Sequence, residues 1–421
     1  MKNKCEKFVI NGGNKLNGEI DIQTSKNATL PILSACLLTD EKITLYDLPK
    51  LTDVDNMLSI LEKMGVRIFS LENKTTIHAD TNLNIDIDCE LSRTMRSSVF
   101  LLGSTLARNK YTTITLPGGC NIGKRPIDIH IHSMKKLNVK VSNLNDQIFF
   151  NAEDAKAGKV KLRLPSVGAT ENLIMFASLL KGKTTIINPA REPEIVDLAN
   201  FLNKMGAKII GAGTNKITIF GVEKLYSTQY RPIGDRIVAG TIACAVALCG
   251  GNVVMKNTNY YYNQKLFQIL SRIGCQIVDK NGIISLSSEG NLKNFGEIHT
   301  GYYPEFPTDL QSMIVTLASV CDGDAMIEER VFDDRFLTIK ELKKMGAQID
   351  QVDPNRIIVH GVKELNSAKI EAFDLRGGAS LVLAGLVAKG ETVLENIHFM
   401  DRGYESFEEM LSSLGADIKR V

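Results

Sequence analysis

One phrase recurs six times along the 421 residues, and it constrains the fold more than any other feature of the sequence. Each copy is a short amphipathic stretch followed by glycine or asparagine and then by a segment in which apolar and polar residues alternate. Examples are LEKMGVRI and LNKMGAKI. Glycine and asparagine favour the left-handed conformation in which many helices end. We therefore expect each copy to be the end of a helix followed directly by a strand. The residues at the glycine position are Gly65, Asn138, Gly206, Gly274, Gly346 and Gly415.

The segments around this phrase repeat as well. Upstream of each copy lies a helix-length run of small apolar residues, such as RIVAGTIACAVALC, and then a β-rich segment, such as NVVMKN. A helix that is apolar on nearly all faces is typical of a buried element. One or two further strands, such as KITIFGV, follow the phrase. The repeating unit is therefore predicted to be β-α-β-α-β-β.

The two ends of the chain indicate how the repeats are grouped. The sixth repeat stops at ADIKRV before its last strands, whereas the opening FVINGGNKLNGEIDIQ has strand character and no preceding helix. We therefore expect the N-terminus to complete the last repeat. This predicts an α/β protein with three repeats in each of two domains, 26–233 forming the first and 1–25 plus 234–421 forming the second. A solenoid of six stacked repeats is the alternative.

Composition excludes several kinds of partner. Lysine plus arginine (50) nearly balances aspartate plus glutamate (48), so no global field attracts nucleic acid or an anionic membrane. Aromatic residues are only 6% and tryptophan is missing, which disfavours base stacking. No run reaches the ~18 apolar residues of a membrane span, and MKNKCEKFVI lacks a signal-peptide apolar region. We expect a cytoplasmic monomer that neither binds nucleic acid nor inserts into a membrane.

The glycine-rich segment LPGGCNIGKRP at 116–126 contains one of the eight cysteines. Cys120 precedes Lys124 and Arg125, and nearby cations lower the pKa of a thiol. The segment resembles a phosphate-binding P-loop, but Arg125 stands where that loop needs the Ser or Thr that binds Mg²⁺. The other cysteines form no CxxC pair and mostly lie in apolar runs, so neither zinc nor a disulfide framework is expected. The segment therefore favours a reactive thiol in an anion-binding loop.

Polar or charged residues stand beside the start of every predicted buried helix. They are Ser25-Lys26-Asn27, Arg93 with Arg96, Ser166-Val167-Gly168, Asp235-Arg236, Thr308-Asp309 and Asp374-Leu375-Arg376, and the loops after the strands add Arg125, Arg191, Arg335 and Arg402. Equivalent positions of a repeat share one face, so helix N-termini and their partial positive charges should gather there. Two such faces would enclose a cleft suited to an anion-rich ligand. The serines and aspartates can equally be ordinary N-caps.

Carboxylates and histidines are the other residue types with possible chemistry. Asp309 is the carboxylate of FPTDLQS, at a proline-marked helix start, and could act as a general base. The six histidines show no metal-ligand spacing, and His130 and His132 of DIHIHS are expected to be structural.

Longer motifs resemble one known family across nearly the whole chain, in order. They are TSKN at 24–27, TMRSS at 94–98, LPGGCNIGKRPIDIH at 116–130, PSVGATEN at 165–172, AREPEIVDLANFL at 190–202, EFPTDLQS at 305–312, VFDDRF at 331–336, FDLRGGASLVLAG at 373–385 and DRGYE at 401–405. These motifs are similar to those of the UDP-N-acetylglucosamine 1-carboxyvinyltransferases. The resemblance implies a two-domain inside-out α/β barrel with the active site in the cleft between the domains.

The resemblance also implies an activity. The enolpyruvyl group of phosphoenolpyruvate would be transferred to the 3-hydroxyl of UDP-N-acetylglucosamine with release of phosphate, the first committed step of peptidoglycan synthesis. The two substrates would be the partners, and neither a metal nor an organic cofactor would be needed.

Each matching residue takes an implied role from the family. Cys120 would donate a proton to the enolpyruvyl methylene carbon, form a covalent adduct and be alkylated by fosfomycin. Asp309 would accept the proton of the sugar hydroxyl. Phosphoenolpyruvate would be bound by Lys26, Arg125 and Arg402, with Arg96 and Arg376 supporting that cluster and Asp374 near the reacting centre. The UDP-sugar would be held by Asn27, Arg125, Pro126, Ile127, Asp128, Ile129, Ser166, Val167, Gly168 and Val331.

Two other functions remain open at this point. The 5-enolpyruvylshikimate-3-phosphate synthases share the addition–elimination mechanism and a Ser-Lys start, but would not call for the Cys120 loop or for DRGYE. A catalytically silent relative that binds the UDP-sugar as a sensor is the second alternative.

Overall fold

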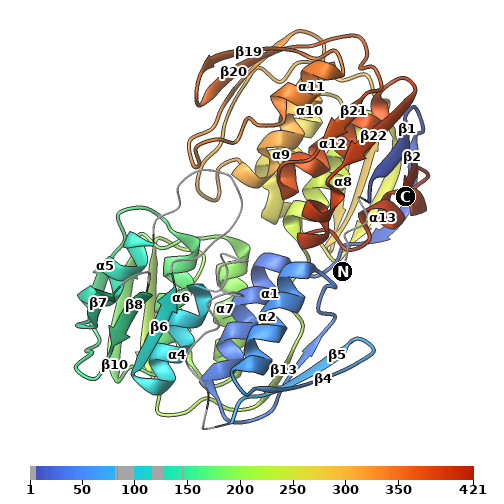
Figure 1. Ribbon diagram of the computed structural model, residues 1–421. Helices are drawn as coiled ribbons and strands as arrows, with labels where there is room; N and C mark the ends of the chain where they lie inside the picture. Colours follow the sequence, from blue (N-terminus) through green and yellow to red (C-terminus); the bar gives the residue numbers. More distant parts are fainter. Residues whose placement is uncertain (1–5, 81–82, 84–98, 116–126, 145–146) are drawn as a thin grey trace. The chain divides into compact units, whose positions relative to one another are not determined.

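The computed structural model describes residues 6–80, 83, 99–115, 127–144 and 147–421 (Figure 1). The chain folds into two units. One unit, called the terminal unit below, comprises the described residues up to Gln23 together with Gly234–Val421. The other, the central unit, comprises the described residues from Thr24 to Ile233. Each unit has its own hydrophobic core, so the chain does not form the single continuous stack of a solenoid.

Three four-stranded sheets of one design make up the terminal unit. In each sheet the first two strands are parallel and the remaining neighbours are antiparallel. In spatial order, these strands are β2 (Leu16–Asp21), β14 (Gly251–Lys256), β16 (Ile283–Ser288) and β15 (Gln276–Lys280); β17 (Glu297–His299), β18 (Asp324–Glu328), β20 (Arg356–His360) and β19 (Gln348–Asp353); and β21 (Lys369–Glu371), β22 (Glu391–Glu395), β1 (Phe8–Asn11) and β23 (Asp417–Arg420).

The central unit repeats this design. Two of its sheets have the same four-strand order, and the third shows the same order for its three described strands. These strands are β13 (Thr228–Tyr230), β3 (Ile43–Tyr46), β5 (Lys74–His78) and β4 (Arg67–Leu71); β9 (Lys159–Lys161), β10 (Gly182–Ile187), β12 (Lys216–Gly221) and β11 (Lys208–Ile210); and β6 (Tyr111–Thr115), β8 (Gln147–Asn151) and β7 (Lys140–Leu144).

One helix of each repeat is buried inside the sheets (Figure 1). These inner helices are α8 (Arg236–Cys249), α10 (Gln311–Val320) and α12 (Leu375–Val387) in the terminal unit, and α1 (Lys26–Ala35), α4 (Leu101–Asn109) and α6 (Val167–Ser178) in the central unit. In the terminal unit the three inner helices pack on one another. Every residue of α12 from Leu375 to Leu386 is buried. The small apolar runs of the sequence thus form helix cores surrounded by strands, as predicted.

A second, more polar helix follows the strand that comes after the inner helix of each repeat, namely β3, β6, β10, β14, β18 or β22. These outer helices are α2 (Thr52–Lys63), α5 (Asp128–Lys136), α7 (Pro193–Lys204), α9 (Gln264–Arg272), α11 (Ile339–Lys344) and α13 (Phe407–Ser413), with short 3₁₀ turns η1 (Cys36–Leu38), η3 (Tyr260–Asn263), η4 (Thr308–Leu310) and η5 (Ile397–Arg402). All six glycine or asparagine positions after these helices have φ between 64° and 121°. The predicted left-handed helix ends are therefore confirmed.

The N-terminal strand completes the last repeat. β1 lies between β22 and β23 and is antiparallel to both, with Ile10 opposite Thr392 and Ile418. The sixth repeat thus takes its missing strand from the start of the chain, which confirms the expectation drawn from ADIKRV and FVING. Near the two points where the chain passes between units, the N–H of Ser25 donates to Ile233 O (2.7 Å) and the N–H of Asp235 donates to Gln23 O (2.8 Å).

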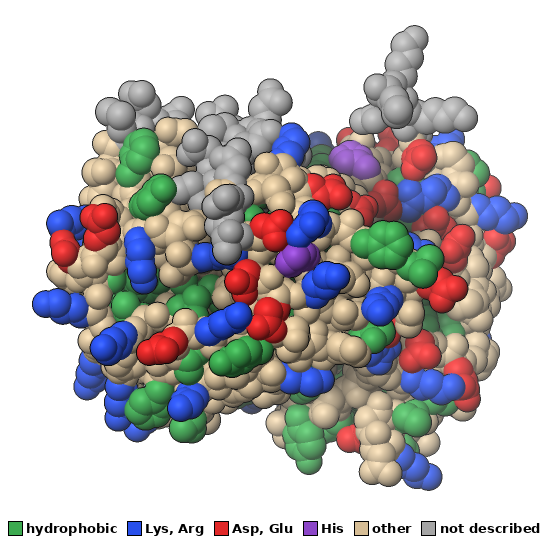
Figure 2. Space-filling model, turned by 90° about the horizontal axis from the view of Figure 1, so that it is seen from below, with side chains coloured by type: hydrophobic (Ala, Val, Ile, Leu, Met, Phe, Trp, Pro, Cys, Tyr) green, Lys and Arg blue, Asp and Glu red, His purple; other side chains and the backbone are tan. Residues whose placement is uncertain are grey.

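Two surface observations agree with the composition. Lysine and arginine side chains are interspersed with aspartate and glutamate on the face drawn in Figure 2. Of the described helices, none has both the length and the apolar character needed to span a membrane.

Candidate functional site

Asp309 lies between two arginines at the inner-helix starts of the terminal unit. It belongs to η4, the turn before α10, and its side chain is 29% exposed. Its Oδ1 accepts a hydrogen bond from Arg335 Nη2 at 2.9 Å, and its Oδ2 lies 3.4 Å from Arg376 Nη2. Both arginine side chains are at least 95% buried. The partly exposed carboxylate is thus held by two buried cations.

These arginines have donors that no described residue satisfies. Within the described structure, Arg335 Nε and Arg376 Nη1 are buried and lack a hydrogen-bond partner. Buried polar groups in native proteins are nearly always paired, so unsatisfied donors beside a carboxylate indicate a place for a further acceptor. An anionic substrate group could supply that acceptor.

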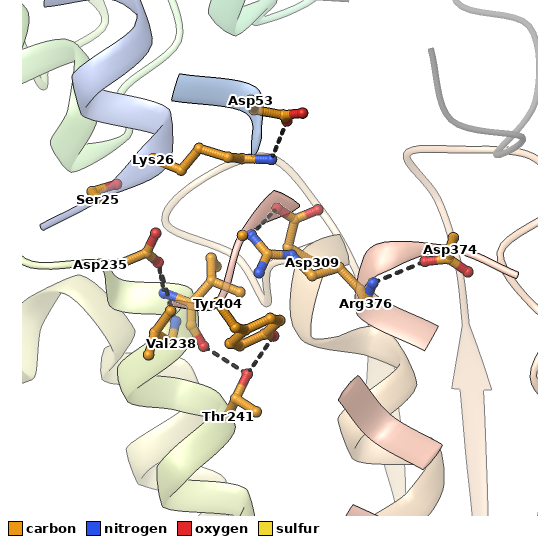
Figure 3. Close-up of polar contacts among 12 residues, drawn as sticks. Ser25, Lys26, Asp53, Asp235, Val238, Thr241, Asp309, Asp374, Arg376 and Tyr404 are labelled. Carbon is orange, nitrogen blue, oxygen red and sulfur yellow. Dashed lines mark hydrogen bonds and ion pairs between the residues drawn. The ribbon is translucent and has the colours of Figure 1, made fainter. Parts of the chain in front are cut away.

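The environment of Arg376 keeps its charge in place. Burial alone lowers the pKa of Arg376, but Tyr404, Asp309 and Asp235 outweigh this effect and raise the pKa above its usual value. Figure 3 shows Arg376, Asp309 and Asp235 at the starts of the inner helices, together with Tyr404. The arginine is therefore a permanent cation.

Asp374 caps the helix that carries Arg376. Its Oδ1 accepts from the backbone N–H groups of Arg376 and Gly377, each at 3.0 Å. Asp235 caps α8 in the same way, accepting from Ile237 at 2.8 Å and Val238 at 3.1 Å. Both carboxylates satisfy helix donors that would otherwise be orphaned. The capping role that the sequence left open is present at both aspartates.

Glu329 connects two segments that carry candidate residues. Its Oε1 accepts from the N–H groups of Val331 (2.8 Å) and Phe332 (3.1 Å), and its Oε2 accepts from Thr308 Oγ1 (2.9 Å). The buried glutamate therefore ties Val331 to the turn that presents Asp309.

Arg402 ends η5, and its neighbour Asp401 is anchored to the last strand. Arg420 Nη2 lies 2.5 Å from Asp401 Oδ1, and Arg420 Nη1 donates to Asp401 Oδ2 at 3.1 Å. Arg420 Nε also donates to Glu408 Oε1 of α13 at 2.8 Å. The segment carrying Arg402 is thus held by a bidentate ion pair.

In the central unit, Lys26 and Asn27 are the first two residues of α1. Ser25 caps this helix by accepting from Ala28 N at 3.3 Å. Lys26 Nζ lies 3.1 Å from Asp53 Oδ2, and the two side chains are 11% and 5% exposed. A lysine at a helix start opposes the helix dipole. Asp53 supplies a compensating anion.

Ser166, Val167 and Gly168 form the capped start of α6. The Ser166 hydroxyl accepts from Ala169 N at 3.4 Å. A Cβ on Gly168 would come within 3.1 Å of the His130 ring, so glycine allows the close approach of α5 here. The structure therefore brings the Ser166 turn beside the start of α5.

The start of α5 carries the other described candidates of the central unit. Ile127 precedes the helix and is buried, Asp128 is its first residue, and Ile129 is half-buried. The Asp128 carboxylate lies 2.5 Å from Arg163 Nη2 at the surface. This ion pair gives Asp128 a protein partner as well as its implied ligand role.

A buried asparagine fixes these helices relative to one another. The Asn172 side chain accepts from Gly103 N at 2.7 Å, donates to Val99 O at 3.1 Å and lies 2.9 Å from His130 Nδ1. Inner helices α4 and α6 and outer helix α5 thereby share one polar contact. His130 is therefore a structural residue, as expected.

The thiols that the structure describes are unreactive. Cys36, Cys244, Cys275 and Cys321 are buried, and burial raises the pKa of each. Cys249 is partly buried, and its pKa is raised to about 12. Cys120, Arg96, Arg125 and Pro126 lie outside the described residues. Across the described ranges, no group of three or more His, Cys, Asp or Glu side chains could hold a metal ion.

Sequence reasoning missed the acidic partners of this site. Asp53 and Glu329 carry no motif of their own, and Asp53 reads as an ordinary acidic residue in the first turn of α2. In the sequence, Arg335 is recognisable as a cation after a strand and as part of the VFDDRF motif, but neither signal names its partner. Its pairing with Asp309 spans 26 positions of sequence and leaves no local signal.

Known proteins resemble this chain in sequence over nearly its whole length. The family model of EPSP synthase (3-phosphoshikimate 1-carboxyvinyltransferase) matches residues 10–411. The chain is 44% identical over 415 residues to UDP-N-acetylglucosamine 1-carboxyvinyltransferase 2 of Caldanaerobacter subterraneus subsp. tengcongensis, covering 99% of each chain. It is also 44% identical over 415 residues to the UDP-N-acetylglucosamine 1-carboxyvinyltransferase of Halothermothrix orenii, again covering 99% of each chain.

Solved structures share the fold. The enolpyruvyl transferase NikO from Streptomyces tendae has a TM-score of 0.87 at 22% identity, covering 99% of each chain. An EPSP synthase from Acinetobacter baumannii has a TM-score of 0.77 at 19% identity, covering 99% of this chain and 100% of that one. The predicted two-domain α/β fold is therefore confirmed.

Proposed function

Since this chain belongs to the EPSP synthase (3-phosphoshikimate 1-carboxyvinyltransferase) family and, within it, to the UDP-N-acetylglucosamine 1-carboxyvinyltransferases, we propose that it transfers the enolpyruvyl group of phosphoenolpyruvate to the 3-hydroxyl of UDP-N-acetylglucosamine. The observation that supports this most directly is Asp309, a partly exposed carboxylate between two buried arginines whose N–H groups are not all satisfied by described residues. A base beside fixed cations suits deprotonation of a hydroxyl next to an anionic co-substrate.

The reaction proceeds by addition and elimination. Asp309 accepts the 3-hydroxyl proton as the sugar oxygen bonds to C2 of phosphoenolpyruvate, and Cys120 donates a proton to C3. In the second step, C3 loses a proton and the bond between C2 and the phosphate oxygen breaks. Phosphate then leaves and the enolpyruvyl ether remains. Neither step consumes an oxidant or reductant, and neither calls for a metal or an organic cofactor.

The remaining site residues bind and orient the substrates in this proposal. Lys26, Arg125 and Arg402 hold the phosphate and carboxylate of phosphoenolpyruvate, supported by Arg96 and Arg376, with Asp374 near the reacting centre. Fixed cations stabilise charge that develops on the leaving phosphate without reorganisation. The UDP-sugar is held by Asn27, the Arg125–Pro126–Ile127–Asp128–Ile129 segment, the Ser166–Val167–Gly168 turn and Val331.

We place this site between the two predicted domains, 26–233 and 1–25 plus 234–421, because each contributes named residues. We further propose a cytoplasmic monomer acting in the first committed step of peptidoglycan synthesis. The five described cysteines are free thiols, which fits a reducing compartment.

Phosphate release tests this function. The full chain is incubated with phosphoenolpyruvate and either UDP-N-acetylglucosamine or shikimate 3-phosphate. We expect release only with the UDP-sugar. Release only with shikimate 3-phosphate would instead assign the synthase activity for which the matching family model is named. Saturable binding of the UDP-sugar without release would identify a silent sensor.

Fosfomycin tests the role of Cys120 separately. We expect inactivation with one added inhibitor mass, located at Cys120 by peptide mass spectrometry. The described cysteines should stay unmodified because burial raises their pKa and suppresses the nucleophilic thiolate. Cys120→Ser is the matched control and should take up no label. Label on another cysteine would contradict the assignment.

A further inference from the structure

Tyr404 joins two of the inner helices in the terminal unit. It lies between η5 and α13, and only 1% of the residue is exposed. Its hydroxyl oxygen is 2.9 Å from Thr241 Oγ1 of α8. Its ring centroid is 5.4 Å from the guanidinium carbon of Arg376 in α12 (Figure 3). One buried side chain thus contacts a helix hydroxyl and a candidate site arginine.

The direction of the Tyr404 hydrogen bond follows from its partner. Thr241 Oγ1 donates to the backbone oxygen of Ile237 at 2.8 Å. A hydroxyl has one hydrogen, so Thr241 must accept the proton of the tyrosine hydroxyl. The Tyr404 oxygen then keeps its lone pairs for a nearby donor or cation. Arg376 is that cation, since Tyr404 is one of the groups that raise the pKa of Arg376.

Other contacts hold Arg376 only loosely. Its contact with Asp309 is 3.4 Å long, whereas Arg335 contacts the same carboxylate at 2.9 Å. Arg376 Nη1 is buried with no hydrogen-bond partner among the described residues. A buried guanidinium with a long ion pair and an unsatisfied donor depends on its remaining neighbours for a fixed orientation. Among these neighbours, Tyr404 offers both an aromatic face and an oxygen lone pair.

We propose that Tyr404, held by Thr241, is a positioning residue that orients the Arg376 guanidinium toward Asp309 for enolpyruvyl transfer. The inference rests on the proposed function, because that function gives Arg376 and Asp309 their roles. Tyr404 itself touches no substrate in this scheme and acts through Arg376. A tyrosine that merely filled the core would support the fold without affecting turnover selectively.

The experiment removes single hydroxyl groups and leaves the packing shape nearly intact. Tyr404→Phe deletes the tyrosine hydroxyl, and Thr241→Val deletes the hydroxyl that accepts its hydrogen bond. Thr241→Ser keeps a hydroxyl at the acceptor position. Thr316→Val is the matched control, because Thr316 is a fully buried α10 threonine whose hydroxyl donates to Ser380 O at 3.2 Å. All variants are compared in the full-length protein by kcat, by KM for UDP-N-acetylglucosamine and by Tm.

We expect a selective loss of turnover. Tyr404→Phe and Thr241→Val should each lower kcat about tenfold, the factor that corresponds to about 1.4 kcal/mol or one net hydrogen bond. KM should stay within about twofold, as for an interaction that matters mainly in the transition state. The double variant should lose no more than either single variant, because both remove one contact. Thr316→Val should lower Tm comparably without changing kcat, and Thr241→Ser should recover the wild-type kcat.

An activity-independent readout separates this inference from the proposed function. In ¹⁵N NMR, Arg376→Lys identifies the Nε–H signal of Arg376, which should shift or broaden in Tyr404→Phe and Thr241→Val but not in Thr316→Val. An unchanged kcat with a lowered Tm, or an unchanged Arg376 signal, would overturn the positioning role. Wild-type protein that releases no phosphate from the UDP-sugar reaction would overturn the proposed function instead, and the NMR comparison would still decide the orientation of Arg376.

Discussion

At the scale of single residues, Asp309 is the side chain whose chemistry the structure constrains most. Asp309→Asn keeps the shape of the group but cannot accept a proton. We expect kcat to fall by about 10²–10⁴, the usual contribution of a general base. Affinity for the UDP-sugar should change less than about threefold, because that loss belongs to the transition state. Steady-state kinetics and calorimetric titration of the UDP-sugar measure the two effects.

This variant also changes the charge beside two buried arginines. It should therefore be assayed well below its Tm, and Asp353→Asn provides a control at a half-buried aspartate of the β19–β20 hairpin. That control should retain wild-type kcat. Turnover that survives in Asp309→Asn would mean that another group is the base.

Asp197 of α7 is a second informative residue, because it gives stability a predictable pH dependence. Its carboxylate accepts from Tyr230 Oη at 2.6 Å and from Ile233 N at 3.2 Å. Burial outweighs these hydrogen bonds and raises the pKa of Asp197 from its ordinary 3.8 to about 6. The folded state thus binds this proton more tightly than the unfolded state. Its contribution is fully present below pH about 3.8 and is lost as pH rises through about 6.

Asp197→Asn should remove this dependence. A difference of about two pKa units corresponds to about 3 kcal/mol of unfolding free energy. The free energy of unfolding of the variant minus that of the wild type should therefore rise by up to about 3 kcal/mol as the pH is raised from 4 to 8. Urea unfolding of the wild type and the variant at several pH values measures the difference, in which groups that titrate alike in both proteins cancel. A stability difference that is flat with pH would contradict the raised pKa.

At the scale of elements, the end of η5 depends on a clamp from the last strand. Arg420 of β23 forms a bidentate pair with Asp401 and a further bond with Glu408, and its side chain is 25% exposed. Lysine cannot reproduce this fork. Arg420→Lys should lower the unfolding free energy by about 1–2 kcal/mol. It should also raise KM for phosphoenolpyruvate about threefold, because the backbone that carries Arg402, next to Asp401, is then held less firmly.

A matched arginine lies in the same unit. Arg356 pairs with Asp353 at 2.6 Å, with side chains 47% and 33% exposed. Arg356→Lys should leave the free energy of unfolding nearly unchanged, because an exposed ion pair contributes little to stability, and should leave KM unchanged. Equal effects of the two substitutions on KM would show that the clamp does not support Arg402.

Elements also show how far sequence reasoning reaches. The six helix ends, the buried helices and the N-terminal strand of the last repeat could be predicted, because each depends on local residue types and on a period that recurs six times. The contacts of Lys26 with Asp53 and of Arg376 with Asp309 could not, since 27 and 67 positions separate the partners. Such pairs depend on how the repeats pack against one another, and the sequence pattern of the repeats does not indicate that packing.

The residues of the candidate site also divide into those that the sequence predicts and those that only the structure reveals. Lys26, Asp309 and Arg376 stand out in the sequence because each is a charged residue beside the start of an apolar helix. Thr241 and Glu329 look like ordinary core or strand-end residues. Tyr404 belongs to the DRGYE motif, but only its tertiary contacts indicate what it does. For the residues outside the described ranges, including Cys120, the family resemblance remains the basis of the assignment.

At the scale of the whole molecule, the described residues form two hydrophobic cores that share no residue. Each core is built from three inner helices and the inward faces of three sheets. Separate cores allow separate opening, and cooperative units of this kind are visible in hydrogen exchange. The chain nevertheless starts and ends in one unit, because β1 pairs with β22 and β23.

This arrangement predicts that core damage stays within one unit. Ile10 of β1 and Ile217 of β12 are both fully buried, one in each core. Ile10→Ala and Ile217→Ala should each cost about 2–5 kcal/mol, the sum of lost burial and a cavity. In hydrogen-exchange mass spectrometry, Ile10→Ala should accelerate exchange in β22, β23 and α12 while β10 and β12 keep wild-type rates. Ile217→Ala should produce the reverse pattern. Because the two substitutions are chemically identical, each serves as the control for the other. Equal acceleration in both units by either variant would mean that the protein opens as one cooperative body despite its divided core.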